Sequence, residues 1–159
     1  MQELISRAKE LLENGTVARV LGWKAGDLSY NPEPAYFTSA EELKDFVYNG
    51  FCGANLSKNM IEASKLEGKT LVCLKPCDTY SFNQLLKEHR VDREKAYIVG
   101  VGCKGKLDIE KAKQLGIKGI ESVAGAEMTD AADTLTFQTL YGEKTCDYSE
   151  VMLERCHEC

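Results

Sequence analysis

The cysteines are the residues of this chain whose type and spacing could do chemistry, and the last two, Cys156 and Cys159, form a Cys-x-x-Cys pair. Sulfurs at this spacing can bind one metal centre, and four thiolates complete either a tetrahedral zinc site or an iron–sulfur cluster. An odd number of thiols leaves a disulfide framework incomplete, and clustered cysteines of intracellular proteins more often bind metal or take part in redox chemistry. We therefore expect a metal or iron–sulfur site. The seven cysteines are Cys52, Cys73, Cys77, Cys103, Cys146, Cys156 and Cys159.

Two further thiols follow segments that are typical of buried strands. Cys77 comes after "TLVCLKP", and Cys103 comes after "YIVGVG". Ligands of an open parallel sheet bind outside the carboxyl ends of its strands, and neighbouring strands lie about 5 Å apart. The sequence therefore predicts that these two sulfurs converge at one edge of the sheet. Together with the terminal pair they form the predicted metal-ligand set Cys77, Cys103, Cys156 and Cys159.

The remaining cysteines differ in what their surroundings predict. Cys52 precedes a predicted helix whose N-terminal dipole favours a thiolate, so it is a reserve metal ligand or a reactive thiol. Cys73 lies in the middle of a predicted strand and is expected to be a small buried apolar residue. Cys146 lies in a polar turn and, like Cys73, is not assigned to the ligand set.

Two glycines and a lysine beside Cys103 form a predicted cofactor-binding segment. Gly102 and Gly105 let the backbone turn sharply and approach a bulky inorganic group, whose sulfides can accept hydrogen bonds from amide N–H groups. Lys104 places between them a positive charge that suits an anionic cofactor. The spacing of these glycines is not that of a phosphate-binding loop.

The elements that must position these residues alternate between strands and helices. Apolar residues recur at helical spacing in some segments, and short β-branched or continuous apolar runs fill others. This order predicts an α/β fold with three layers, in which a mostly parallel sheet has helices on both faces. We expect a single α/β domain over residues 1–159, with a cysteine-rich C-terminal end at 146–159. We expect helices at 3–13, 38–50, 55–68, 79–90 and 108–116, strands at 16–23, 70–75, 95–103 and 117–124, an edge strand or hairpin arm at 134–143, a proline-containing loop at 24–36, and a last helical turn or two at 148–155.

Charge and hydropathy exclude some classes of partner. The formal net charge is −5, from 20 basic and 25 acidic residues, and no segment concentrates positive charge, so a nucleic acid is not expected as a partner. The chain has no apolar run of the length that a membrane span needs, and residues 1–15 form an amphipathic helix rather than a signal peptide. We therefore expect a cytoplasmic protein that does not bind a membrane.

One long segment resembles a known family. It reads "GKTLVCLKPCDTYSFNQLLKEHR" followed by "AYIVGVGCKGKLD". This order of strand, Pro-Cys, helix with a leucine pair, strand and Cys-Lys-Gly is similar to that in the beta subunits of coenzyme F420 (deazaflavin) hydrogenases and formate dehydrogenases. The matching residues are Pro76, Cys77, Leu85, Leu86, Cys103, Lys104 and Gly105.

The resemblance implies an iron–sulfur protein. It implies an α/β domain with a [4Fe-4S] cluster and, in complete family members, bound FAD. The expected partners are other redox subunits or a C-terminal ferredoxin-like module. The terminal "RCHEC" resembles the start of such a cysteine-rich module. We therefore interpret the chain as the front part of a longer iron–sulfur polypeptide. The run of four closely spaced cysteines found in bacterial ferredoxins is absent from the sequence.

Three functions compete for these thiols. The first is an iron–sulfur electron-transfer domain or subunit of a hydrogenase, formate dehydrogenase or heterodisulfide-reductase-type complex, which makes the chain a component of an oxidoreductase rather than the complete catalyst. The second is a structural zinc site in an assembly module without redox activity. The third is a thiol oxidoreductase that uses Cys156 and Cys159, although a redox-active Cys-x-x-Cys normally opens a helix that follows a strand.

Overall fold

The structure, a computed structural model, describes residues 1–128 and 133–159, and the chain divides into two compact units. The length and composition predict one domain. The contacts between Cα atoms group the chain into two units, and the chain passes several times from one unit to the other. Unit 1 comprises Met1–Lys24, Pro34–Phe46 and Ala54–Gly102, and unit 2 comprises Ala25–Glu33, Val47–Gly53 and Cys103–Cys159.

Unit 1 is built on the predicted parallel sheet. Its strand order is β2-β1-β3-β4, and β3 pairs in parallel with both β1 and β4. The central strand β3 has all five residues buried, as its continuous apolar sequence requires when a sheet is covered on both faces. The strands are β1 (Arg19–Lys24), β2 (Glu33–Phe37), β3 (Thr70–Leu74) and β4 (Ala96–Gly100).

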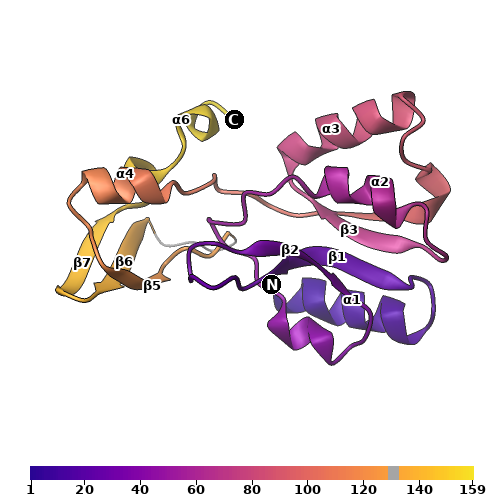
Figure 1. The fold of residues 1–159 in the computed structure, drawn as a ribbon, viewed down its shortest axis with the longest axis horizontal. Helices are drawn as coiled ribbons and strands as arrows, with labels where there is room; N and C mark the ends of the chain where they lie inside the picture. Colours follow the sequence, from indigo (N-terminus) through magenta and orange to yellow (C-terminus); the bar gives the residue numbers. More distant parts are fainter. Residues whose placement is uncertain (129–132) are drawn as a thin grey trace. The chain divides into compact units, whose positions relative to one another are not determined.

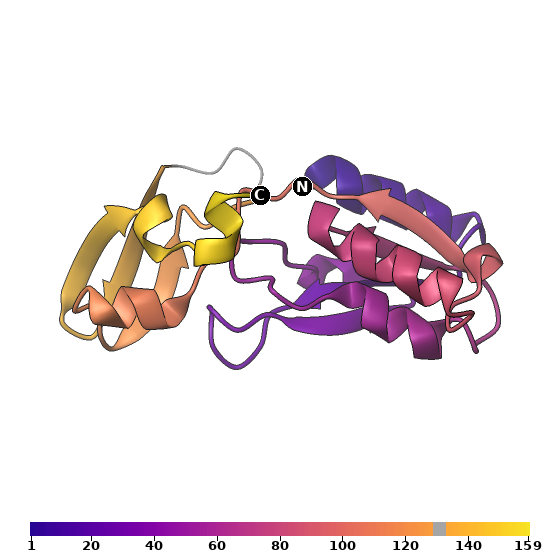
Figure 2. The same ribbon diagram turned by 90° about the horizontal axis from the view of Figure 1, so that it is seen from above.

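Helices cover both faces of this sheet, which confirms the predicted α/β architecture. Helix α1 (Gln2–Glu13) lies on one face, and α2 (Met60–Ala63) and α3 (Pro76–Lys87) lie on the other (Figures 1 and 2). The succession β3-α3-β4 is the expected βαβ unit. Short 3-10 helices at η1 (Glu42–Asp45), η2 (Leu56–Asn59) and η3 (Arg93–Lys95) complete the unit.

Two sequence predictions in unit 1 are wrong. The predicted helix at 38–50 is reduced to η1. The backbone N–H of Thr38 donates to the Glu42 carboxylate, as in a capping box. The backbone of Phe46 is extended, however, and its ring packs on Phe37. The predicted loop at 24–36 contains β2, which includes Pro34. A proline is tolerated there because β2 is an edge strand of the sheet.

Unit 2 contains a second sheet, which the sequence assigned to the first. Strands β5 (Ile120–Ala124), β6 (Thr134–Thr139) and β7 (Gly142–Asp147) form an antiparallel sheet in that order. The predicted strand and hairpin arm are therefore present, with β6 central. Helices α4 (Ile109–Gln114), α5 (Tyr148–Val151) and α6 (Glu154–His157) complete the unit, and its core is formed by Phe51, Leu107, Ala112, Ile117, Ala126, Leu135, Phe137, Tyr148 and Val151.

Within residues 1–128 and 133–159, no helix has the length and apolar character needed to cross a bilayer.

Candidate functional site

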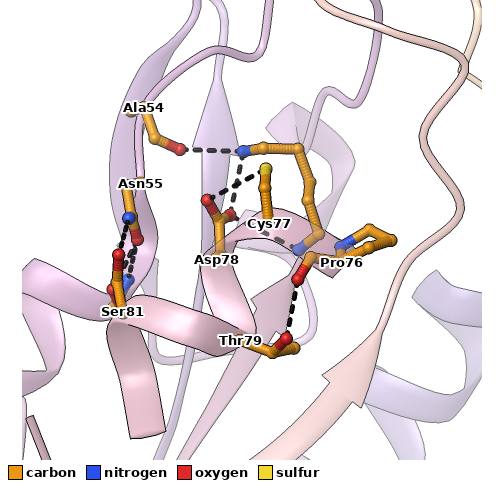
Figure 3. A network of polar contacts seen from close by, with 9 residues as sticks. Ala54, Asn55, Pro76, Cys77, Asp78, Thr79 and Ser81 are labelled. Atoms are coloured by element: carbon orange, nitrogen blue, oxygen red, sulfur yellow. Dashed lines mark hydrogen bonds and ion pairs between the residues drawn. The ribbon is translucent and has the colours of Figure 1, made fainter. Parts of the chain in front are cut away.

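In unit 1, Cys77 lies where the sequence places it, directly beyond the carboxyl end of β3. Helix α3 begins at Pro76 with Lys75 as its N-cap residue, three residues earlier than predicted, so Cys77 is the second residue of the helix. Its thiol is exposed, and its Sγ donates to Oδ1 of Asp78 at 3.9 Å (Figure 3). Cys77 is therefore a solvent-accessible thiol beside a carboxylate.

A buried ion pair supports this helix start. Nζ of Lys75 lies 3.0 Å from Oδ2 of Asp78, and the two residues are 4% and 3% exposed. The same ammonium group donates to the carbonyl oxygen of Ala54 at 2.9 Å (Figure 3). It also lies 4.5 Å from the centroid of the Trp23 ring. A buried charge requires this kind of complete pairing. The pair thus links the carboxyl ends of β1 and β3 to the segment that begins at Ala54.

A second polar link holds the same region of unit 1. The side chain of Asn55 caps η2 by accepting from the backbone N–H of Ser57 at 3.0 Å, and its Nδ2 donates to Oγ of Ser81 on α3 at 2.9 Å (Figure 3). The sequence suggested Asp78 only as a possible helix cap and did not reveal its ion pair with Lys75. Their signal is an acid at the third position of a helix that directly follows a buried strand, where it forms a capping box.

In unit 2, the loop that carries Cys103 lies against the segment that carries Cys156. The backbone N–H of Lys106 donates to Sγ of Cys156 at 3.4 Å. Gly105 has a φ of +131°, and a Cβ atom placed on it would collide with Sδ of Met152 and lie 3.4 Å from Cβ of Cys156. A glycine is therefore required for this close approach.

Tyr148 is buried beside the loop that follows Cys103. It is 2% exposed, and its hydroxyl donates to the carbonyl oxygen of Gly105 at 2.9 Å. Burial and, after it, the negative charges of the Cys103 and Cys156 thiolates raise the pKa of this hydroxyl. The charges of Cys103 and Cys156 thus act on the same buried tyrosine hydroxyl. Tyr148 was not predicted, although Asp147 and Glu150 around it form a capping box that marks the start of α5.

Lys104 lies on the same tyrosine. Its Nζ is 4.6 Å from the centroid of the Tyr148 ring and 3.1 Å from Oδ1 of Asp133. Lys104 directly follows Cys103 in the chain. Its predicted contact with an anionic cofactor stays a prediction, and so does the predicted cofactor contact of Gly105. Gly102 is the last residue of unit 1.

The other predicted ligands lie in different surroundings. Cys159 is exposed, and its backbone N–H donates to the carbonyl oxygen of Cys156 at 3.4 Å. Cys52 is 0% exposed, and its Sγ accepts from the backbone N–H of Asn49 at 3.4 Å and donates to the carbonyl oxygen of Val47 at 3.7 Å. Its sulfur is thus held within its own turn.

The two cysteines left out of the ligand set both have a raised pKa. Burial raises the pKa of Cys73, in the middle of β3, to about 12. Burial, with the nearby Glu150 and Asp147 carboxylates, raises the pKa of Cys146 to about 11. Cys146 lies on β7 opposite Leu135 rather than in a turn. A protonated thiol is a poor metal ligand, so neither of these two is suited to bind metal.

The donor chemistry of unit 2 fits part of an iron–sulfur site. Cys103 and Cys156 could supply two of the four thiolates that a [4Fe-4S] cluster needs, and the backbone N–H of Lys106 donates to the sulfur of Cys156. In the part of the chain that the structure describes, no three His, Cys, Asp or Glu side chains form a group that could hold a metal ion. Cys77 belongs to unit 1, and the other four predicted ligands belong to unit 2.

Comparison with known proteins identifies relatives of this chain. The beta subunit of F420-dependent formate dehydrogenase 1 from Methanococcus maripaludis is 28% identical over 107 residues, which are 67% of this chain and 28% of that protein. The chain is a homologue of the beta subunits of F420-dependent formate dehydrogenases. A second such subunit, from Methanocaldococcus jannaschii, is 27% identical over 99 residues, which are 62% of this chain and 26% of that protein. This homologue of the beta subunits therefore spans about a quarter of the length of the relatives that it matches.

A solved structure shares the fold. A chain of the F420-reducing [NiFe] hydrogenase complex from Methanosarcina barkeri superposes with a TM-score of 0.61 at 14% identity, over 99% of this chain and 62% of that one. No family model matches the sequence. The relatives confirm the resemblance to F420 hydrogenase and formate dehydrogenase beta subunits, and the superposition confirms the fold.

Proposed function

We propose that this chain is an electron-transfer component of a redox complex of the formate dehydrogenase or hydrogenase kind, and that thiolates of unit 2 bind its [4Fe-4S] cluster. The observation that carries the proposal is the approach of Cys156 to the loop that follows Cys103, where the Lys106 N–H donates to the Cys156 sulfur. The homology to beta subunits of formate dehydrogenases supports the type of complex.

Each residue of this region has a task in the proposal. Cys103 and Cys156 bind iron, and Cys159, one turn beyond Cys156, adds a third thiolate. The N–H of Lys106 donates to the Cys156 sulfur, which stabilises its negative charge. Gly105 keeps the backbone close enough for this bond. The sequence assigns the fourth thiolate to Cys77, with Cys52 as the reserve ligand, and both stay predictions.

Bound by these thiolates, a [4Fe-4S] cluster would supply one-electron transfer between a reduced and an oxidised carrier, with no bond made or broken. The two carriers are other redox groups of the complex, such as a flavin and the cluster of a partner subunit. FAD binding by this chain, with Gly102, Lys104 and Gly105 beside it, follows from the family resemblance alone and stays a prediction.

Metal analysis of the whole chain purified without oxygen tests the proposal. We expect about four irons and four sulfides per chain with an absorbance near 400 nm that bleaches on reduction. Cys103→Ser and Cys156→Ser should each lose most of the iron. Cys146→Ser is the matched control and should keep it, because Cys146 lies on β7 with its pKa raised.

The same measurements distinguish the other functions and locate the fourth ligand. Loss of iron in Cys77→Ser or in Cys52→Ser assigns the fourth thiolate. About one zinc and no iron per chain would replace the proposal with a structural zinc site. Full iron content in both Cys103→Ser and Cys156→Ser would show that unit 2 does not hold the cluster by these thiols.

A further inference from the structure

Strand β4 is one of the two edge strands of the sheet in unit 1. Its sequence, AYIVG, is a continuous apolar run of the kind that lies between two neighbouring strands, and it contains neither a charged residue nor a proline. Its register with β3 is regular over all five residues, without a bulge. An edge strand presents backbone N–H and C=O groups that can pair with another chain unless a charge, a proline, a bulge or a covering segment prevents it.

The other edges each carry such a protective feature. Strand β2, at the opposite edge of the same sheet, contains Pro34. Strand β7 carries the charged residues Glu143 and Lys144. Beside β5, the hydroxyl of Ser29 donates to the carbonyl oxygen of Glu121 at 3.1 Å, so a loop occupies part of that edge. Among the sheet edges that the structure describes, β4 is therefore the one without protection against pairing.

The backbone of β4 directs two residues away from β3. The N–H of Val101 donates to the carbonyl oxygen of Leu74 on β3 at 3.0 Å. Backbone groups of successive residues in a strand point to alternate sides, so Val99 also faces β3, whereas Ile98 and Gly100 face outward. No residue within 1–128 and 133–159 bonds to these outward groups, and a Cβ placed on Gly100 would have no atom within 4 Å. A second strand can therefore approach this edge.

We propose that β4 pairs with β4 of a second copy of this chain, antiparallel and about a twofold axis at Val99. Ala96 also faces outward, but its carbonyl oxygen already accepts from Nη1 of Arg93 at 2.8 Å. The register centred on Val99 uses only the free groups, since Ile98 of each copy exchanges backbone hydrogen bonds with Gly100 of the other.

A second copy fits this edge because the strand is complementary to itself. The same free groups serve as donor and acceptor on both chains, as an isologous interface requires. Because β4 has no charged residue, antiparallel self-pairing places no like charges opposite each other. The pairing involves none of the cysteines, so it is independent of the proposed function.

Sedimentation velocity of the whole chain over a range of concentrations, with a reducing agent to remove disulfide-linked dimers, tests the proposal. We expect a dimer that dissociates on dilution. Gly100→Pro removes the outward N–H and places a ring on the edge while keeping the bonds to β3, so its mass should stay that of a monomer. Gly100→Ala is the matched control, because it keeps the N–H and fills open space, and it should dimerise like the wild type.

Charge pairs at Val99 test the register. Val99→Lys and Val99→Glu each place like charges opposite each other across the axis and should be monomeric alone, whereas an equimolar mixture of the two should dimerise. A monomeric wild type at every concentration would overturn the proposal and leave this edge to a strand of another polypeptide. A dimer that persists in Gly100→Pro, or a mixture that stays monomeric while both charged variants are folded, would also overturn it. If a charged variant does not fold, the Gly100 pair decides.

Discussion

Replacing Lys75 with methionine leaves the Asp78 carboxylate buried without its ion-pair partner. Asp78 is 3% exposed, and its Oδ2 then keeps only the 3.4 Å hydrogen bond from the backbone N–H of residue 75. Removing one member of a buried ion pair typically costs about 3–5 kcal/mol, because an uncompensated charge stays in the protein interior. The lost contact with the Trp23 ring adds to the effect. We therefore expect Lys75→Met to lower the free energy of unfolding by about 3–5 kcal/mol.

Urea denaturation followed by tryptophan fluorescence measures this change. Trp23 is the single tryptophan of the sequence, is 0% exposed and belongs to unit 1, so its signal reports the unit that contains the ion pair. Lys65→Met is the matched control. Lys65 pairs with Glu62 at 2.7 Å, but these side chains are 64% and 73% exposed, and such a surface pair contributes less than about 1 kcal/mol.

The double variant Lys75→Met, Asp78→Asn separates the buried charge from the packing. The second substitution removes the orphaned charge and keeps an amide oxygen as an acceptor for the helix start, so much of the stability lost in the single variant should return. The reasoning is refuted if Lys75→Met costs no more than Lys65→Met. It is also refuted if the double variant is as unstable as the single one, because the cost would then come from lost packing.

Three further predictions concern the loop of unit 2 and the buried Cys73 thiol of unit 1. Gly105→Ala should lower the free energy of unfolding by about 1–3 kcal/mol, because its Cβ would collide with Met152 and its φ is +131°. The control Gly116→Ala, where φ is +80° and no atom lies within 4 Å of the added Cβ, should cost about 1 kcal/mol. Thermal unfolding compares the two variants, and equal costs would contradict the close approach at Gly105. Tyr148→Phe should cost about 1 kcal/mol by urea denaturation, because the Gly105 carbonyl loses its donor, and an unchanged midpoint would show that this bond does not stabilise the loop. Burial raises the pKa of Cys73 to about 12, above its ordinary value of about 8.5, so the stability that this thiol contributes is intact below pH 8.5 and is lost as the pH rises toward 12. Urea titrations at pH 8 and 10.5 should show a steeper loss for the wild type than for Cys73→Val, by at most about 1.4 kcal/mol per pH unit, and parallel losses would argue against this assignment.

The parts of the fold that could be predicted are those whose signals lie close together in the chain. The buried run at 70–74, the cap at Asp108 and the stop at Asn14 each depend on a few neighbouring residues, and they appear as expected. The predicted helix at 38–50 failed because a local capping signal competed with the packing of Phe46 on Phe37, which the sequence does not reveal. The strand at Pro34 was overlooked because only an edge position tolerates proline, and edges are a property of the whole sheet.

The candidate site divides in the same way. The sequence by itself determined the types of the reactive residues, the βαβ unit whose two strands are followed by Cys77 and Cys103, and the resemblance to the beta subunits. Residue type and local periodicity can be read directly from the sequence. Only the tertiary structure decided that Cys156 lies against a loop 50 residues earlier in the chain, that Tyr148 adjoins it, and that Lys75 is buried with Asp78. Contacts of this kind depend on how distant segments pack around each hydrophobic core, and residue spacing carries no record of that packing.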